Sequence, residues 1–138
     1  MAAVFAGFVV GYLLALVAGP LAAVLIVRSN HRSGVAQRLA PPGTSVIALS
    51  VVLHFAAILL LTALGLVLGM ALHALELRRP ERGLGSPNLL YTLLVLAITA
   101  VLVIPAVAVP AMRKYGVAAA VVLLLTFGWL MPWVAQLG

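Results

Sequence analysis

Ionisable side chains are rare in this sequence, and His54 lies deep inside an apolar stretch. Its imidazole could ligate a haem or a chlorin, or relay protons. It could instead stay neutral and hydrogen-bond a hydroxyl on a neighbouring helix, such as that of Thr92, Thr99 or Thr126. We favour the hydrogen-bonded state, because a bis-histidine haem would need a second buried histidine on another helix. A homodimer that pairs two copies of His54, or a methionine ligand, would restore the cofactor site.

The remaining residues that could carry chemistry form no recognisable site. His31 and His73 lie near the ends of apolar stretches, where a partly solvated histidine is ordinary and no membrane carboxylate completes a metal site. The chain has no cysteine, which excludes disulfides, thiolate catalysis and cysteine-ligated metal. The sequence also lacks a phosphate-binding glycine loop, a Gly-x-Ser-x-Gly elbow, a His-Glu-x-x-His pair and paired carboxylates. We therefore expect no catalytic residue, no metal site and no enzymatic activity.

The segments that carry these residues are long enough to cross a bilayer. Of the 138 residues, 66% are hydrophobic and 7% are charged, and the mean hydropathy is +1.32. No charge falls inside four apolar stretches, each longer than the ~20 residues that span a hydrocarbon core, at approximately 2–27, 46–75, 89–112 and 116–137. These stretches are apolar on every face, unlike the alternating strands of a barrel. The sequence predicts an all-α fold: a single transmembrane domain, built as a four-helix bundle of two helical hairpins.

Small residues recur every four positions along the first two predicted helices. Such stripes let helix backbones approach closely in lipid, where no hydrophobic effect drives helices together. The spacing leaves open whether the close contact forms within the chain or with another subunit. The predicted helix-packing residues are Gly7, Gly11, Ala15 and Gly19 in the first helix, and Gly65 and Gly69 in the second.

Proline and aromatic residues indicate the shape and depth of the predicted helices. A proline inside a helix removes a backbone donor and exposes a carbonyl one turn earlier. We expect kinks near helix ends, and not a substrate site, from the prolines within the spans, which are Pro20, Pro105, Pro110 and Pro132. Aromatic residues near span ends predict side chains at headgroup depth, and these are Tyr91, Tyr115, Trp129 and Trp133.

Basic residues border the predicted spans and set their orientation. Five lie in the first and third connections, Arg28, Arg32, Arg38, Arg113 and Lys114, against three in the second. The positive-inside rule therefore places those two connections in the cytoplasm and both termini outside, in a bacterial-type cytoplasmic membrane. The same five side chains could contact anionic lipid headgroups or a partner. The net charge of +6 thus reflects membrane orientation, and we expect no nucleic acid partner.

Three functions fit this pattern. A small accessory or structural subunit, packed within a respiratory, photosynthetic or transport complex, explains uncharged helices with small-residue stripes and needs no cofactor. A small transporter or channel is the first alternative, and its polar lining would come from Ser50, Thr62, Thr92, Thr99 and Thr126. A membrane protein that binds haem or a pigment through His54 is the second alternative. We expect the lipid bilayer, with other membrane subunits or further copies of the chain, as partners.

Overall fold

The computed structural model describes residues 1–29, 43, 45–77, 89–108, 110 and 112–136, and every regular element in them is helical. The elements are α1 (Ala2–Ser29), α3 (Val46–Leu77), α4 (Leu89–Ala108), α5 (Arg113–Leu123), the π-helical segment η1 (Leu124–Leu130) and α6 (Met131–Ala135). The last three follow one another without a break, so the described residues contain four helical segments that are long and apolar enough to cross a membrane. The predicted all-α four-helix fold is confirmed.

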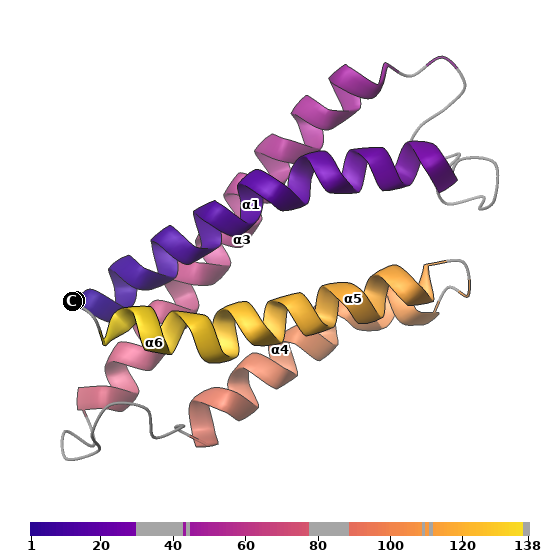
Figure 1. The fold of residues 1–138 in the computed structure, drawn as a ribbon. Helices are drawn as coiled ribbons and strands as arrows, with labels where there is room; N and C mark the ends of the chain where they lie inside the picture. Colours follow the sequence, from indigo (N-terminus) through magenta and orange to yellow (C-terminus); the bar gives the residue numbers. More distant parts are fainter. Residues whose placement is uncertain (30–42, 44, 78–88, 109, 111, 137–138) are drawn as a thin grey trace.

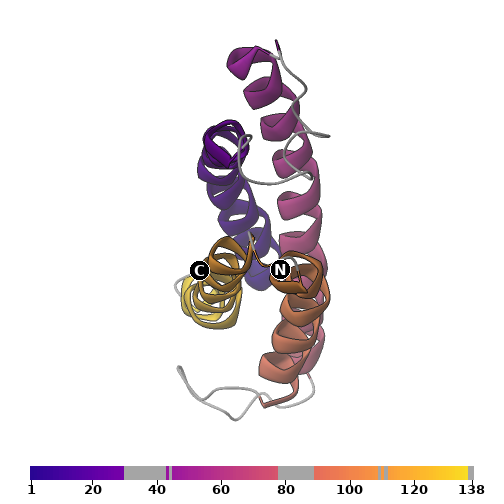
Figure 2. The same cartoon turned by 90° about the vertical axis from the view of Figure 1, so that its right-hand side faces the viewer.

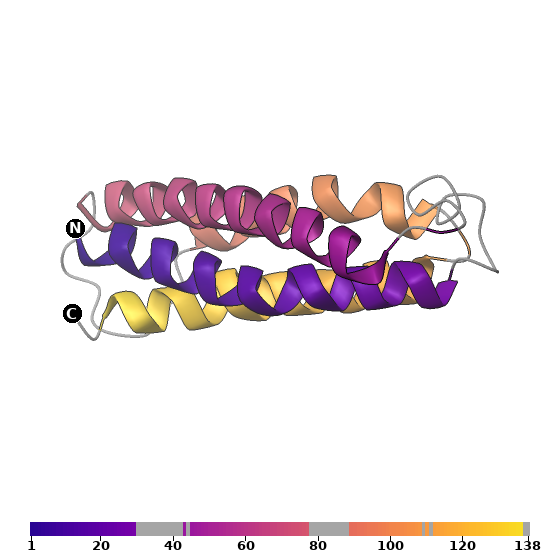
Figure 3. The ribbon, with the colours of Figure 1, turned by 90° about the horizontal axis from the view of Figure 1, so that it is seen from above.

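The spans are arranged as two hairpins. One pairs α1 with α3, and the other pairs α4 with α5 and η1 (Figures 1 and 2). Between the hairpins, α1 contacts α6 and η1, and α3 contacts α4. The start of α1 and the end of α6 lie at the same end of the bundle (Figure 3), as an even number of crossings requires.

The boundary between the third and fourth spans differs from the expected one. Helix α4 ends at Ala108 and the last span begins at Arg113, whereas the charge pattern placed these bounds at 112 and 116. Pro110 is the physical reason, because it has no N–H to continue the helix and it disfavours helical geometry in the residue before it. Pro110 therefore lies beyond α4, whereas Pro105 lies within it. The first turn of α5 carries Arg113 and Lys114, so it lies outside the uncharged stretch 116–137 that predicted this span.

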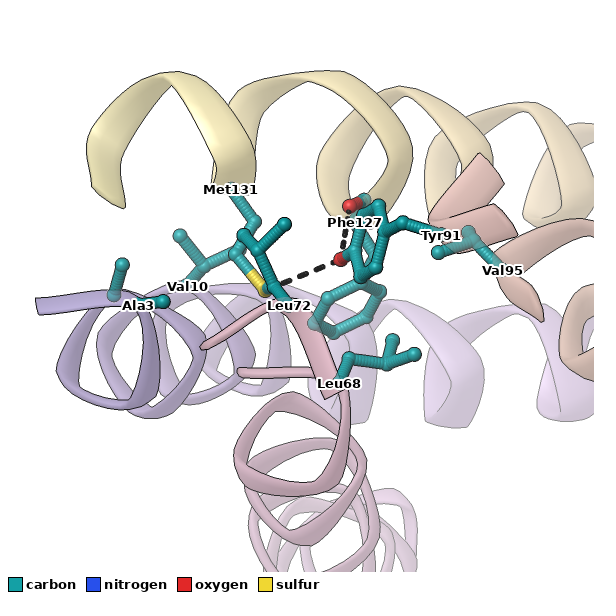
Figure 4. Packing of buried hydrophobic residues seen from close by; sticks show 9 residues of the cluster. Ala3, Val10, Leu68, Leu72, Tyr91, Val95, Phe127 and Met131 are labelled. Atoms are coloured by element: carbon teal, nitrogen blue, oxygen red, sulfur yellow. Dashed lines mark hydrogen bonds between the residues drawn. The ribbon is translucent and has the colours of Figure 1, made fainter. Parts of the chain in front are cut away.

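The side chains that hold the two hairpins together are gathered toward the end of the bundle that carries the termini. Ala3, Ala6 and Val10 of α1 meet Leu68 and Leu72 of α3 there. The second hairpin adds four buried residues (Figure 4), which are Tyr91, Val95, Phe127 and Met131. The hairpin of α4 and α5 diverges from α1 and α3 toward the opposite end (Figure 1). The nine-residue cluster is therefore the main junction between the hairpins.

Candidate functional site

Helices α1 and α3 touch backbone to backbone at their glycines. A Cβ atom added to Gly7 would collide with the carbonyl oxygen of Gly65, and one added to Gly65 would collide with that of Gly7. The same holds for Gly11 against the carbonyl of Leu61, and a Cβ on Gly69 would lie 2.6 Å from the carbonyl oxygen of Ala3. Close approach of this kind increases van der Waals contact and suits Cα–H···O contacts. The small-residue stripes therefore face each other within one chain.

The contact continues along α1 to His54. Ala15, Gly19 and Ala23 are buried. A Cβ on Gly19 would lie 2.5 Å from the Cα of His54, so the backbone of His54 is in direct contact with α1 at Gly19. The fourth member of the stripe thus positions the histidine.

The imidazole of His54 is partly buried, and its Nδ1 atom is fully buried with no hydrogen-bond partner among the described residues. None of the hydroxyls of Thr92, Thr99 and Thr126 bonds this Nδ1 atom in that part of the chain. The expected hydroxyl pairing is therefore not found at this nitrogen. The fold places the backbone of His54 against α1, whereas the three threonines belong to the other hairpin. A buried ring nitrogen without a partner is costly.

The hydroxyls considered for a polar pathway are dispersed. Thr62 lies in the α1–α3 contact beside Gly11, and its Oγ1 is buried with no partner in the described structure. Thr99 is buried on α4, whereas Thr92 is exposed. An apolar groove of about 400 Å³ lies between the start of α1 and α6, and none of these hydroxyls lines it. Its walls are Met1, Ala2, Phe5, Ala6, Val9 and Val134.

Tyr91, one of the four aromatic residues predicted at headgroup depth, is packed inside the bundle, with 2% of its surface exposed. Its hydroxyl donates a hydrogen bond to the carbonyl oxygen of Phe127 at 2.7 Å, and the sulfur of Met131 lies 3.7 Å away (Figure 4). The other three aromatic residues of that prediction, Tyr115, Trp129 and Trp133, are exposed. Tyr91 is therefore a buried link between the third and fourth spans.

Pro132 explains why the carbonyl of Phe127 receives no backbone hydrogen bond and can accept one from Tyr91. In an α-helix, the N–H of Met131 would bond to the Phe127 carbonyl, but here it bonds to that of Thr126, five residues back. The residue that would serve Phe127 in this π register is Pro132, which has no N–H. The Phe127 carbonyl therefore has no donor from either residue, and the hydroxyl of Tyr91 takes that place. The lost donor at Pro132 is visible in the sequence, whereas its replacement by the Tyr91 hydroxyl is not.

Basic side chains lie at the end of the bundle opposite the termini. Arg28 lies in the last turn of α1, while Arg113 and Lys114 begin α5, and all three are exposed. The Nε of Arg113 donates to the carbonyl oxygen of Val107 at 3.4 Å, which leaves its other guanidinium N–H groups for further contacts. Arg32 and Arg38 lie outside the described residues. The described basic residues from two different hairpins thus share one end of the molecule.

Among the residues that the structure describes, no three His, Cys, Asp or Glu side chains gather into a metal-binding group. Comparison of the chain with models of known protein families, with curated proteins and with solved structures gave no match. The function must therefore be inferred from the geometry of the chain itself.

Proposed function

We propose that this protein is a small structural subunit that packs within a larger membrane protein complex. The observation that carries the proposal is the exposure of the first half of α3. From Val46 to Leu64 no residue is buried within the chain, although the helix is apolar there. Ile47, Phe55 and Leu59 point outward along this stretch. One histidine nitrogen in the same stretch has no partner in the described structure.

The way the chain uses its few inward polar and small residues also supports a packing role. The glycines bring α1 and α3 together, and the Tyr91 hydroxyl satisfies a carbonyl freed by Pro132. Residues committed to internal packing in this way form a rigid scaffold. The large apolar surface that remains on α3 is available to lipid or to helices of other subunits.

Purification from the native membrane in mild detergent tests the proposal. We expect the tagged chain to elute in a complex larger than itself, with other membrane subunits in a fixed ratio, as measured by native mass determination and identification of the co-eluting chains. Elution alone, or only with further copies of itself, would contradict the proposal.

A photo-crosslinking amino acid at Phe55 tests the face of α3 directly. Phe55 is 63% exposed, and Val101 of α4 is 72% exposed and serves as the matched control. We expect position 55 to crosslink to the same subunit that co-purifies in a fixed ratio, and position 101 to crosslink mainly to lipid. Equal crosslinking from both positions would contradict the assignment of the partner face to α3.

We also propose that both termini face the outside, as the distribution of basic residues indicates. Because the chain contains no cysteine, a single introduced thiol reports on one position. An impermeant thiol reagent added to intact cells is expected to label Gln136→Cys at the end of α6, and to label Ser45→Cys at the start of α3 only after permeabilisation. The reversed pattern would show the opposite orientation.

A second candidate is a haem- or pigment-binding role for His54, favoured by the unpartnered Nδ1 of its imidazole. This reading predicts a strong visible absorption band in the purified complex that is lost or shifted in His54→Ala. A colourless preparation, or a band that His54→Ala leaves unchanged, excludes it.

A further inference from the structure

One face of α1 packs against the second hairpin at one end of the bundle and is open at the other. Ala6 and Val10 of this face are buried in the cluster that includes Phe127 and Met131. Residues 11 positions further along an α-helix return to nearly the same face, so Val17 and Leu21 continue it. These two side chains are 64% and 54% exposed. We call Val17, Leu21 and Val24 the open face of α1.

The second hairpin does not close over the open face. Helix α1 contacts η1 and α6, and α5 is not among its main contacts. Figures 1 and 3 nevertheless show α5 running beside this half of α1. Gly116 of α5 packs against Ala106 and Val107 of α4. Tyr115, about a quarter turn away from Gly116, remains exposed. The open face of α1 is therefore not covered by α5, and its exposed side chains are apolar.

Basic groups lie at the same end of the bundle as the open face. Arg28 lies seven residues after Leu21, which places it on the open face and about 10 Å further along α1. Arg113 and Lys114 lie at the same end of the bundle, at the start of α5. We call Arg28, Arg113 and Lys114 the rim. Exposed apolar side chains next to these cations complement a molecule with a hydrocarbon chain and an anionic head.

We propose that an anionic phospholipid binds between the hairpins. One acyl chain lies along the open face of α1, and the phosphate is held by Arg28, Arg113 and Lys114. The guanidinium groups offer several N–H donors to phosphate oxygens, and each cation adds electrostatic attraction. A second copy in parallel orientation would bring like charges to the same rim, so charge complementarity favours the lipid. The proposal holds independently of whether the chain belongs to a larger complex.

Fluorescence quenching by brominated lipids tests the proposal on the full chain. Trp129 and Trp133 are first replaced by phenylalanine, and one tryptophan is then introduced as Leu21→Trp. Val101→Trp is the control. Val101 lies seven residues before the end of α4 and Leu21 eight residues before the end of α1, and Val101 is 72% exposed. Each protein is reconstituted in vesicles that contain brominated phosphatidylglycerol in phosphatidylcholine, or brominated phosphatidylcholine in phosphatidylglycerol.

We expect the tryptophan at position 21 to prefer phosphatidylglycerol over phosphatidylcholine by at least about threefold, and the one at position 101 to show a ratio near 1. R28Q/R113Q/K114Q brings the ratio at position 21 to about 1, whereas R28K/R113K/K114R retains the preference. Raising the salt concentration to about 1 M lowers the ratio in the unaltered rim as well, so the result does not depend on the folding of the glutamine variant.

Two outcomes overturn the proposal. Equal quenching by both lipids at position 21 shows that ordinary bilayer lipid covers the open face of α1 and that the rim does not select an anionic headgroup. Quenching by neither lipid at position 21, with normal quenching at position 101, shows that a second copy of the chain or another subunit covers the open face.

Discussion

Replacing Gly65 with leucine is expected to destabilise the protein by at least about 3 kcal/mol, because a side chain there separates two backbones that are in direct contact. A Cβ at Gly65 would collide with the Gly7 carbonyl, which belongs to the backbone and cannot rotate away as a side-chain atom can. The measurement is the free energy of unfolding in mixed micelles, followed by circular dichroism. Gly65→Ala should show a smaller loss of the same sign.

Two controls separate this collision from a general effect of larger residues in a membrane helix. Ala63→Leu adds bulk on the exposed side of α3, and Gly128→Ala adds a Cβ whose nearest neighbour, Val95, lies at an ordinary contact distance of 3.8 Å. Both are expected to change the free energy of unfolding by less than about 1 kcal/mol. If Ala63→Leu were as damaging as Gly65→Leu, the α1–α3 contact would not be the cause.

Removing the hydroxyl of Tyr91 is expected to cost about 1–2 kcal/mol, although Tyr91→Phe preserves the size and shape of the ring. The loss arises at Phe127, whose buried carbonyl would have neither a backbone donor nor a side-chain donor. The same unfolding measurement applies, and Tyr115→Phe is the matched control because Tyr115 is exposed. Equal stability of Tyr91→Phe and the original protein would show that the hydrogen bond contributes little.

A double-mutant cycle with Pro132→Ala tests the origin of the free carbonyl. Alanine restores an N–H at position 132 and removes the ring that clashes in an α-helix, so the last span can return to the α register and Met131 can donate to Phe127. Tyr91→Phe should then cost clearly less in the Pro132→Ala background than alone. Additive effects would mean that Pro132 and Tyr91 act independently.

The sequence predicts the four helical spans because apolar runs of this length leave the backbone no alternative in a membrane. It does not predict the boundary near Pro110 correctly, since charge marks where a helix leaves the hydrocarbon and not where its hydrogen bonding stops. Arg113 and Lys114 extend the last helix beyond the apolar run, and Pro110 shortens the one before it. The residue at which a helix ends and the residue at which it leaves the hydrocarbon need not be the same. At Pro110, Arg113 and Lys114 the two differ.

The positions of Tyr91 and His54 could not be predicted from their own surroundings in the sequence. Tyr91 stands at the start of an apolar run, as an interfacial tyrosine would, and its burial depends on a carbonyl freed 36 residues later. The backbone of His54 lies against α1 because a glycine stripe brings α1 against α3. In both cases the deciding contact is tertiary, and only the residue types could be recognised beforehand.

The junction of the two hairpins near one end gives the protein different cross-sections in the two leaflets. The spans converge around Tyr91 and Phe127 and diverge toward Arg28 and Arg113. Lipids next to such a body must splay in one leaflet and crowd in the other, so its insertion free energy depends on the spontaneous curvature of the membrane. The glycine contacts and the junction therefore give the chain a taper that would make it sensitive to membrane shape.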